Sequence, residues 1–244
     1  MAHSVVNIAR KFIVISGSES KDFLQGLITN DIKKLDNEKI LFSAFLTPTG
    51  RFLYDFFIWP WKDGYLIDIS EKFFAAFLQK LKLYKLRKDV LITEKNGLEA
   101  AIIFPAIRED EVEVIAARDP RKENFATRIL VQKDDLKLIS SHYSHNIDYE
   151  TYRIENLIAE GDKDLEQEKS VILEYGYNEQ NAISYDKGCY LGQELITRTY
   201  RLGMVRKKLV SLIFDKEVKI TLPYIVEING KKMAIITSIS HHLD

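Results

Sequence analysis

Residues 186–203 read Asp186-Lys187-Gly188-Cys189-Tyr190-Leu191-Gly192-Gln193-Glu194-Leu195-Ile196-Thr197-Arg198-Thr199-Tyr200-Arg201-Leu202-Gly203 and contain the only cysteine of the 244-residue chain. Gly188 allows the backbone to turn tightly beside the thiol. From Cys189 onward the spacing of apolar residues is typical of a helix, which would place the thiol near a helix N-terminus. The helix dipole and Lys187 would then both favour a thiolate.

A second interpretation of the same residues stays open. A single cysteine is most often a small, buried apolar side chain. No histidine lies nearby in the sequence to act as a base. The two glycines could serve close packing, and Lys187 could be a solvated side chain. The residues alone therefore leave two roles for Cys189, a reactive thiol or a packed one.

The pattern K-G-C-Y-x-G-Q-E at 187–194, followed by Arg198, resembles the signature of the YgfZ-type folate-binding proteins. That family includes mitochondrial factors that mature iron–sulfur enzymes. It is related to the T-protein of the glycine cleavage system, whose similar segment has no cysteine. The resemblance implies an α+β fold with antiparallel sheets and helices around a central channel for tetrahydrofolate or a derivative. It also implies chemistry at Cys189 and Lys187, with Gln193 and Arg198 at the folate.

Composition excludes several other classes of protein. The chain is 46% hydrophobic and 29% charged with a net charge of −1, so we expect no bulk attraction to nucleic acid or membrane. One cysteine excludes an internal disulfide and is typical of a reducing compartment. The first residues lack the apolar run of a signal peptide, and no stretch approaches the ~20 apolar residues of a membrane span. We expect a location in the cytoplasm or, in a eukaryote, in the mitochondrial matrix.

The first quarter of the chain predicts a strand at 12–15, a helix after it, and a hairpin formed by 40–46 and 51–59. "TPTGRFLYDFFIW" in this hairpin resembles a family segment, T-P-x-G-R/K-x-x-x-D. In T-proteins the corresponding strand carries two adjacent aspartates, and an aspartate there supports aminomethyl transfer. Only Asp55 remains here. Because alternate residues of a strand point to opposite faces, Asp55 is either solvated or buried with a partner.

Residues 70–81 predict an amphipathic helix with a basic end at 80–88. This basic stretch could bind an anion such as RNA, but a solvated face is the simpler interpretation because the chain has no net positive charge. Short strands are predicted at 98–104, 112–116 and 128–131. His142 and His145 are three residues apart, but no acid or cysteine nearby completes a ligand set, so we predict no metal site.

"YRIENLIAEGDKDLEQEKSVILE" at 152–174, at the end of a helix predicted for 147–158, also resembles the family. The resemblance assigns Arg153, Glu160 and Glu174 to the folate pocket. An arginine fork can hold the glutamate carboxylate of folate, and a carboxylate can accept hydrogen bonds from the pterin. The alternative is a structural ion pair between Arg153 and Glu174.

Two domains are expected, a folate-binding domain at 1–204 and a small β module at 205–244. In the module, 209–214 predicts a strand, and the stretches 224–228 and 233–239 flank Asn229-Gly230, a strong hairpin signal. About 40 residues are too few to be stable alone, so we expect the module to pack on the main domain. The resemblance implies a β-barrel at this place, which we expect to be incomplete and shortened here.

These observations favour a folate-binding accessory protein, and not a classical enzyme, that supports assembly or repair of iron–sulfur cluster enzymes. One cysteine cannot supply the three or four thiolates that a cluster normally needs, so iron–sulfur enzymes or assembly proteins would be partners. One alternative is a tetrahydrofolate-dependent aminomethyltransferase that uses Asp55, although the missing second aspartate argues against it. A weaker alternative is a helper of tRNA modification that binds tRNA through 80–88.

Overall fold

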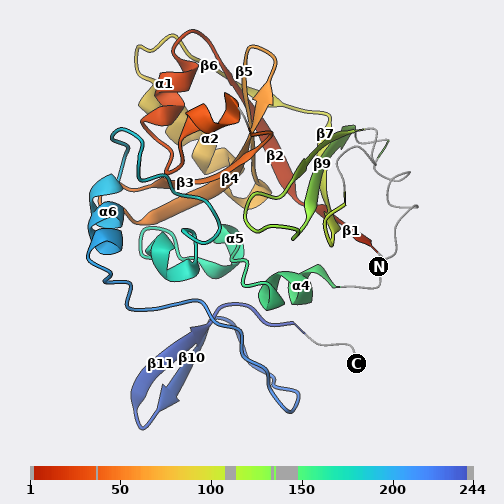
Figure 1. Cartoon of the computed structure of the whole chain (residues 1–244), viewed down its shortest axis with the longest axis vertical. Coiled ribbons are helices and arrows are strands. Elements are labelled where there is room, and N and C mark those ends of the chain that lie inside the picture. The colour runs from red at the N-terminus through yellow and green to blue at the C-terminus, as the bar shows by residue number, and fades with distance from the viewer. Residues whose placement is uncertain (1–2, 37, 108–113, 133–134, 136–147, 241–244) are drawn as a thin grey trace.

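The structure is a computed structural model, and it describes residues 3–36, 38–107, 114–132, 135 and 148–240 (Figure 1). Two antiparallel sheets and a helical segment form the main body, and a hairpin lies below them in the figure. This mixed α+β arrangement confirms the fold class that the sequence predicts.

The larger sheet has five antiparallel strands in the order β3-β4-β5-β2-β6. Its strands are β2 (Arg10–Ser16), β3 (Leu41–Leu46), β4 (Phe52–Trp61), β5 (Gly64–Ser70) and β6 (Leu91–Lys95). The elements α1 (Ser20–Gln25), η1 (Ile32–Asp36) and α2 (Glu71–Lys85) accompany it. Residues 52–59 of β4 are all buried, because both faces of this central strand are covered. Phe77 of α2 packs on Phe56 from one face, and the guanidinium of Arg128 lies over the ring of Phe57 on the other.

The smaller sheet has four antiparallel strands in the order β1-β7-β9-β8. They are β1 (Ser4–Ile8), β7 (Leu98–Phe104), β8 (Ile115–Arg118) and β9 (Thr127–Gln132). The two central strands, β7 and β9, are buried almost throughout, as their runs of Ile, Ala, Leu and Val require. The predicted strands at 98–104 and 128–131 are therefore confirmed.

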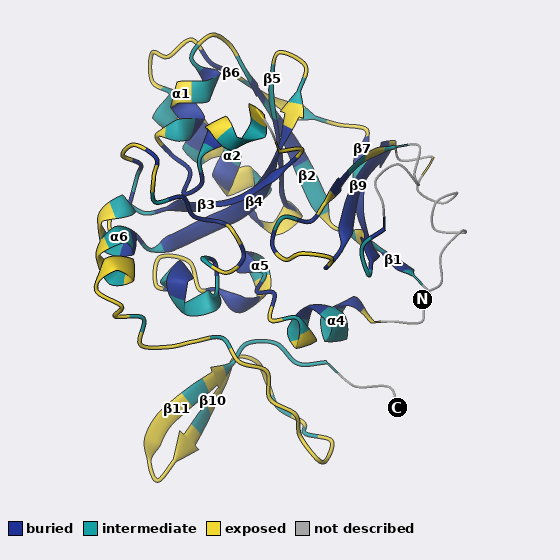
Figure 2. Ribbon diagram, viewed as in Figure 1, coloured by how far each residue is buried: buried dark blue, intermediate teal, exposed yellow. Residues whose placement is uncertain are grey.

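A segment of short helices lies below the two sheets, and a hairpin follows it. Its elements are α4 (Tyr149–Glu155), α5 (Gly161–Asp164), η3 (Ile172–Tyr175), α6 (Gln193–Arg201), β10 (Tyr224–Ile228) and β11 (Lys231–Ile236). Figure 2 shows that the sheets are mainly buried whereas the hairpin is mainly exposed. The core thus lies in the upper body and not around the hairpin.

Two predictions about the last quarter of the chain are wrong. The helix expected from Cys189 begins only at Gln193, because Gly192 stands before it with a left-handed φ of +80° that no helical residue adopts. Residues 209–214 form no strand, since no neighbouring strand in the described chain supplies a ladder for their backbone groups. The hairpin around Asn229-Gly230, in contrast, is confirmed.

Candidate functional site

Lys187 acts as a clamp for the motif loop, which we define as residues 184–192. Its Nζ donates hydrogen bonds to the carbonyl oxygens of Gln25 at 2.7 Å, Ile28 at 2.8 Å and Asn30 at 2.7 Å. These carbonyls lie at the end of α1 and in the turn after it. Burial of the ammonium lowers its pKa to about 8. All three N–H groups are engaged with the backbone, so none is left to activate the thiol.

Backbone hydrogen bonds fix the motif loop on both sides of this clamp. The N–H of Ser184 donates to the carbonyl of Thr29, and the N–H of Leu191 donates to the carbonyl of Gly26, both at 3.0 Å. A side chain at Gly192 would put its Cβ 2.5 Å from a carbonyl oxygen of the β3–β4 turn, so only glycine fits there. The loop is therefore attached to the body at several points.

Cys189 is exposed on this loop, and the structure gives its thiol no hydrogen bond within the described residues. The packed role that the sequence left open is therefore excluded. The predicted activation needs correction, because the thiol precedes the first residue of α6 by four positions and the helix dipole acts only near the first turn. The geometry shows a thiol that is presented to the outside on an anchored loop.

Two further predicted residues lie on α6. Gln193 begins the helix, and its Oε1 accepts a hydrogen bond from the backbone N–H of Tyr190 at 3.3 Å. Arg198 lies in the last turn and is exposed, and its side chain has no partner within the described chain. Their assignment to folate stays a prediction.

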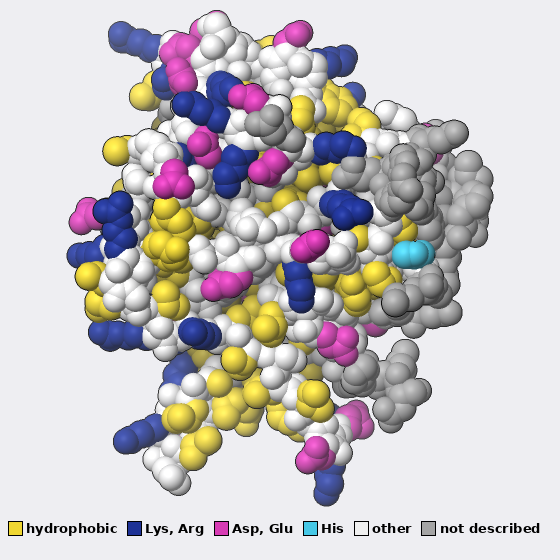
Figure 3. Space-filling view, viewed as in Figure 1, with side chains coloured by type: hydrophobic (Ala, Val, Ile, Leu, Met, Phe, Trp, Pro, Cys, Tyr) yellow, Lys and Arg dark blue, Asp and Glu magenta, His cyan; other side chains and the backbone are white. Residues whose placement is uncertain are grey.

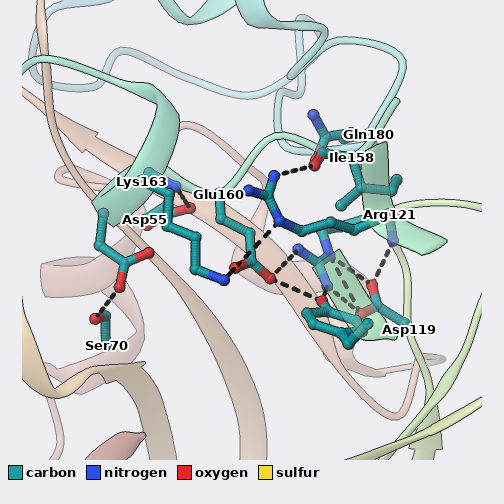
Figure 4. Close-up of polar contacts among 12 residues, drawn as sticks. Asp55, Ser70, Asp119, Arg121, Ile158, Glu160, Lys163 and Gln180 are labelled. Atoms are coloured by element: carbon teal, nitrogen blue, oxygen red, sulfur yellow. Dashed lines mark hydrogen bonds and ion pairs between the residues drawn. The ribbon is translucent and has the colours of Figure 1, made fainter. Parts of the chain in front are cut away.

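A second group of functional candidates is a set of charges, mostly buried, between the sheets and the α4–α5 segment, which we call the central charge cluster. Figure 4 shows part of it, with Arg121, Asp119 and Glu160 directed toward one another. Its members are Arg10, Asp68, Asp119, Arg121, Arg128, Glu150, Arg153, Glu160, Lys163 and Asp164. With five positive and five negative side chains, the cluster neutralises itself.

Aspartates of the cluster are held ionised by arginines. Asp68 of β5 is fully buried, and it accepts hydrogen bonds from Arg10 at 2.5 Å and from Arg128 at 2.9 Å. Burial alone would raise the pKa of Asp68, but these two arginines lower it below its ordinary value. The guanidinium of Arg128 also lies 3.7 Å from the ring centre of Phe57, so an aromatic face covers part of its charge.

Glu160 of the cluster has several partners of positive charge. It accepts a hydrogen bond from the hydroxyl of Tyr149 at 2.7 Å and forms ion pairs with Lys163 at 2.8 Å and Arg121 at 3.7 Å. Burial would raise its pKa, but Arg121, Lys163 and Arg153 outweigh that effect and lower the pKa to about 2. The side chain is therefore an anion at every physiological pH.

Arg153 of α4 is almost completely buried, and its five N–H donors are all used inside the chain. Two donate to Glu150, at 2.9 and 2.7 Å, and one donates to Asp164 at 2.8 Å. The others donate to the carbonyl of Ile158 at 3.2 Å and to the hydroxyl of Ser238 at 2.7 Å. In this conformation the fork has no free donor for a folate carboxylate, so such a contact requires an exchange of partners.

Asp55 of β4 is buried, which decides between the two placements that the sequence allows. Its Oδ2 accepts hydrogen bonds from the hydroxyl of Tyr177 at 2.9 Å and from the backbone N–H of Gly161 at 3.0 Å. Burial raises the pKa of Asp55 to about 6, and neighbouring Arg10 offsets only part of this effect. Asp55 can therefore exchange a proton near neutral pH.

The structure separates the predicted site residues into groups. Asp55, Arg153 and Glu160 meet around residues 158–164, where Gly161 follows Glu160 directly. Cys189 lies with the other motif residues on the anchored loop and α6. Glu174 belongs to neither group, because it forms an ion pair with Lys207 at 3.5 Å. The alternative of an Arg153–Glu174 ion pair is therefore wrong.

Sequence reasoning missed most of the central charge cluster. Asp68 and Arg128 stand inside apolar strands, and Asp119 and Arg121 follow the short strand β8. A charge within an apolar strand must find a partner when the strand is buried on both faces. Asp68 and Arg128 both carried that signal in the sequence. The sequence did not show that they are each other's partners, because 60 residues separate them.

No group of three or more His, Cys, Asp or Glu side chains could hold a metal ion in the part of the chain that the structure describes. His142 and His145 lie outside the described residues. Within the described ranges, no helix has the length and apolar character needed to cross a membrane.

Comparison with known proteins places these features in context. No model of a protein family matches the chain. Curated relatives include the mitochondrial "iron-sulfur cluster assembly factor IBA57 homolog" of Mycosarcoma maydis, which is 30% identical over 223 residues that cover 84% of this chain and 55% of the relative. The mitochondrial IBA57 factors of Mus musculus and Homo sapiens are 28% and 27% identical, over 82% and 84% of this chain and 63% and 64% of their own length. The chain thus spans between about half and two thirds of these relatives.

A solved structure has the same fold. The glycine cleavage system aminomethyltransferase T from Bartonella henselae superposes with a TM-score of 0.65 over 82% of this chain and 64% of its own, at 10% sequence identity. This likeness establishes the fold alone, as the identity is too low to carry individual residues across. The T-protein likeness gives the fold, and from the sequence similarity to the IBA57 factors we conclude that the chain belongs to the YgfZ-type family, which includes IBA57.

Proposed function

We propose that the chain supports the assembly or repair of iron–sulfur cluster enzymes as a folate-binding accessory protein, with Cys189 as its reactive group. The observation that carries the proposal is the motif loop, which presents the chain's one thiol to solvent on a backbone that Lys187 clamps in place. The names of the IBA57 relatives support the role in cluster assembly.

A single presented thiol suits a contact with a partner and not the permanent storage of a cluster. Clusters normally need three or four thiolate ligands, so other ligands must come from a second protein or from small thiols. Because the loop is anchored before it meets the partner, little conformational entropy is lost in forming that contact. The chain would therefore act in a complex with an iron–sulfur enzyme or an assembly protein.

The T-protein fold supports folate as the ligand of the central region. Two buried polar atoms lack a partner within the described residues. One is the Nε–H donor of Arg128, in the central charge cluster, and the other is the Oε1 acceptor of Gln180. A pterin carries both donors and acceptors and could satisfy groups of this kind. Arg153 and Glu160, in contrast, already have internal partners, so we assign them to holding the surrounding backbone in place and not to direct contact with the ligand.

The relatives' names also bear on the compartment. They are mitochondrial proteins, which is compatible with the matrix, the second of the two compartments that the sequence allows.

Complementation tests the thiol. Cells that lack their own IBA57-type factor receive the wild-type chain, Cys189→Ala, or Asp186→Asn as a matched change at an exposed loop position. We expect wild type and Asp186→Asn to restore the activity of cluster-containing enzymes and Cys189→Ala to fail at equal protein level. Isothermal titration with tetrahydrofolate tests the ligand separately, and we expect one site with a Kd near micromolar, about −8 kcal/mol.

A second candidate function is aminomethyl transfer, which the pKa of about 6 at Asp55 favours because general acid–base groups work best near the operating pH. This enzyme would transfer the methylene carbon of an aminomethyl-lipoyl carrier to tetrahydrofolate, with the nitrogen leaving as ammonia and the carrier left as its dithiol. Product formation by wild type that is lost in Asp55→Asn would establish the transferase. Without product, the accessory role stands alone.

A further inference from the structure

The C-terminal module, here residues 205–240, exposes apolar side chains to an unusual degree. None of its residues is fully buried. Its most exposed large apolar side chains are Ile213 at 89%, Val210 and Met233 at 63%, Ile228 at 55% and Leu212 at 53%. Figure 3 shows hydrophobic side chains gathered over this lower end of the molecule. A contiguous apolar surface of this kind is typical of a site that binds another molecule.

The backbone of the module is also incomplete as a sheet. β10 and β11 pair only with each other among the described strands, so each has an outer edge of backbone N–H and C=O groups. A two-stranded hairpin is only marginally stable in water. Residues 209–214 form no strand, so they add no ladder to these edges. An extended peptide can pair with such an edge by β-strand addition.

Charge selects the kind of occupant. The module carries seven Lys and Arg against three Asp and Glu, a net charge of +4, whereas the whole chain has −1 and the remainder therefore −5. A symmetric contact between two copies would bring two +4 surfaces together, which disfavours a second copy. A lipid surface offers no backbone groups to the open strand edges. An acidic polypeptide satisfies both the charge and the edge.

We infer that the C-terminal module docks an acidic segment of a partner protein as an added strand beside β10 or β11, with apolar side chains alternating between its acids. This inference rests on the proposed function, since it gives the partner of the accessory protein a binding mode. Because neighbouring residues of a strand point to opposite faces, Lys232 of β11 would face the acids on one side of the added strand, and Met233 with Ile228 would contact its apolar side chains on the other.

The test uses the full chain and a defined probe, a fluorescein-labelled peptide in which Glu alternates with Val and Ile. Fluorescence anisotropy should show saturable binding that weakens as salt is added. The double variant Lys231→Glu/Lys232→Glu should bind about tenfold more weakly. The matched control reverses two exposed cations near the end of α2, Lys82→Glu/Arg87→Glu, and should bind like wild type.

Several results would overturn the inference. One is that the wild-type chain does not bind the acidic peptide, or binds a peptide with Lys in place of Glu equally tightly. Another is that the Lys231/Lys232 reversal and the Lys82/Arg87 reversal weaken binding of the acidic peptide by the same factor. A dimer that the Lys231/Lys232 reversal disperses, or binding to phosphatidylserine vesicles that the peptide does not compete, would assign the surface to those occupants instead. Cys189→Ala must bind the peptide like wild type, so loss of complementation in that variant leaves this inference untouched.

Discussion

Replacing Lys187 by methionine tests whether this residue is the clamp of the motif loop. Methionine keeps an unbranched apolar stem but removes the ammonium that three carbonyls accept from. A buried acceptor left unsatisfied costs about 1–3 kcal/mol, so three give about 6 kcal/mol. Removing the buried charge recovers about 3 kcal/mol, from the shift of the pKa from 10.5 to about 8. We therefore expect a net loss of about 3 kcal/mol at neutral pH.

The assay for Lys187→Met is urea unfolding followed by tryptophan fluorescence, with Lys33→Met as the control. Lys33 is exposed and its side chain is not part of the clamp, so its replacement should change the free energy of unfolding by less than about 0.5 kcal/mol. If Lys187→Met is no less stable than Lys33→Met, the clamp contributes nothing and the role assigned to Lys187 is refuted.

Three further changes probe the central region. Between pH 4 and 6 the folded chain binds a proton at Asp55 that the unfolded chain has released, because burial raises the pKa of this carboxyl to about 6. The free energy of unfolding of wild type therefore falls as the pH rises through this window. In Asp55→Asn, up to about 3 kcal/mol of that pH dependence should disappear from the unfolding curves. Gly161→Ala would place a Cβ 2.4 Å from Oδ1 of Asp55 and should lower the free energy of unfolding by about 2 kcal/mol. Gly188→Ala is the control, because its Cβ would have nothing within 4 Å, and it should lower the free energy of unfolding by less than about 1 kcal/mol. Arg153→Ala removes the hydrogen bond to Ser238 and should make the C-terminal module more sensitive to proteolysis, while an unchanged digestion pattern would contradict that anchoring role.

The fold was largely predictable because its strongest patterns are local. The apolar run of β4 and the Asn229-Gly230 turn each indicate their element within a few residues. The start of α6 was not predictable by spacing, because the loop before it is held by carbonyls of Gln25, Ile28 and Asn30, about 160 residues earlier. Tertiary hydrogen bonds there decide against a helix that the local sequence favours.

The candidate site was predictable only in part, for a similar reason. The motif identified Cys189, and exposure of the thiol followed from the structure alone. Lys187 was assigned to the thiol because the two are close in sequence, whereas its three hydrogen bonds are to a distant turn. Arg153 was assigned to a ligand, but Glu150 and Asp164 use its donors. Sequence proximity and motif membership do not show where a long side chain ends.

The measurement that tests the central claim most directly is the activity of cluster-containing enzymes restored by Cys189→Ala relative to wild type, at matched levels of folded protein. The presented thiol predicts restoration close to that of the empty vector, together with unchanged thermal stability of the purified variant, since the exposed side chain packs against nothing that its loss would disturb. Restoration equal to wild type would contradict the account, because the chain would then act without the one group that its motif loop is built to present.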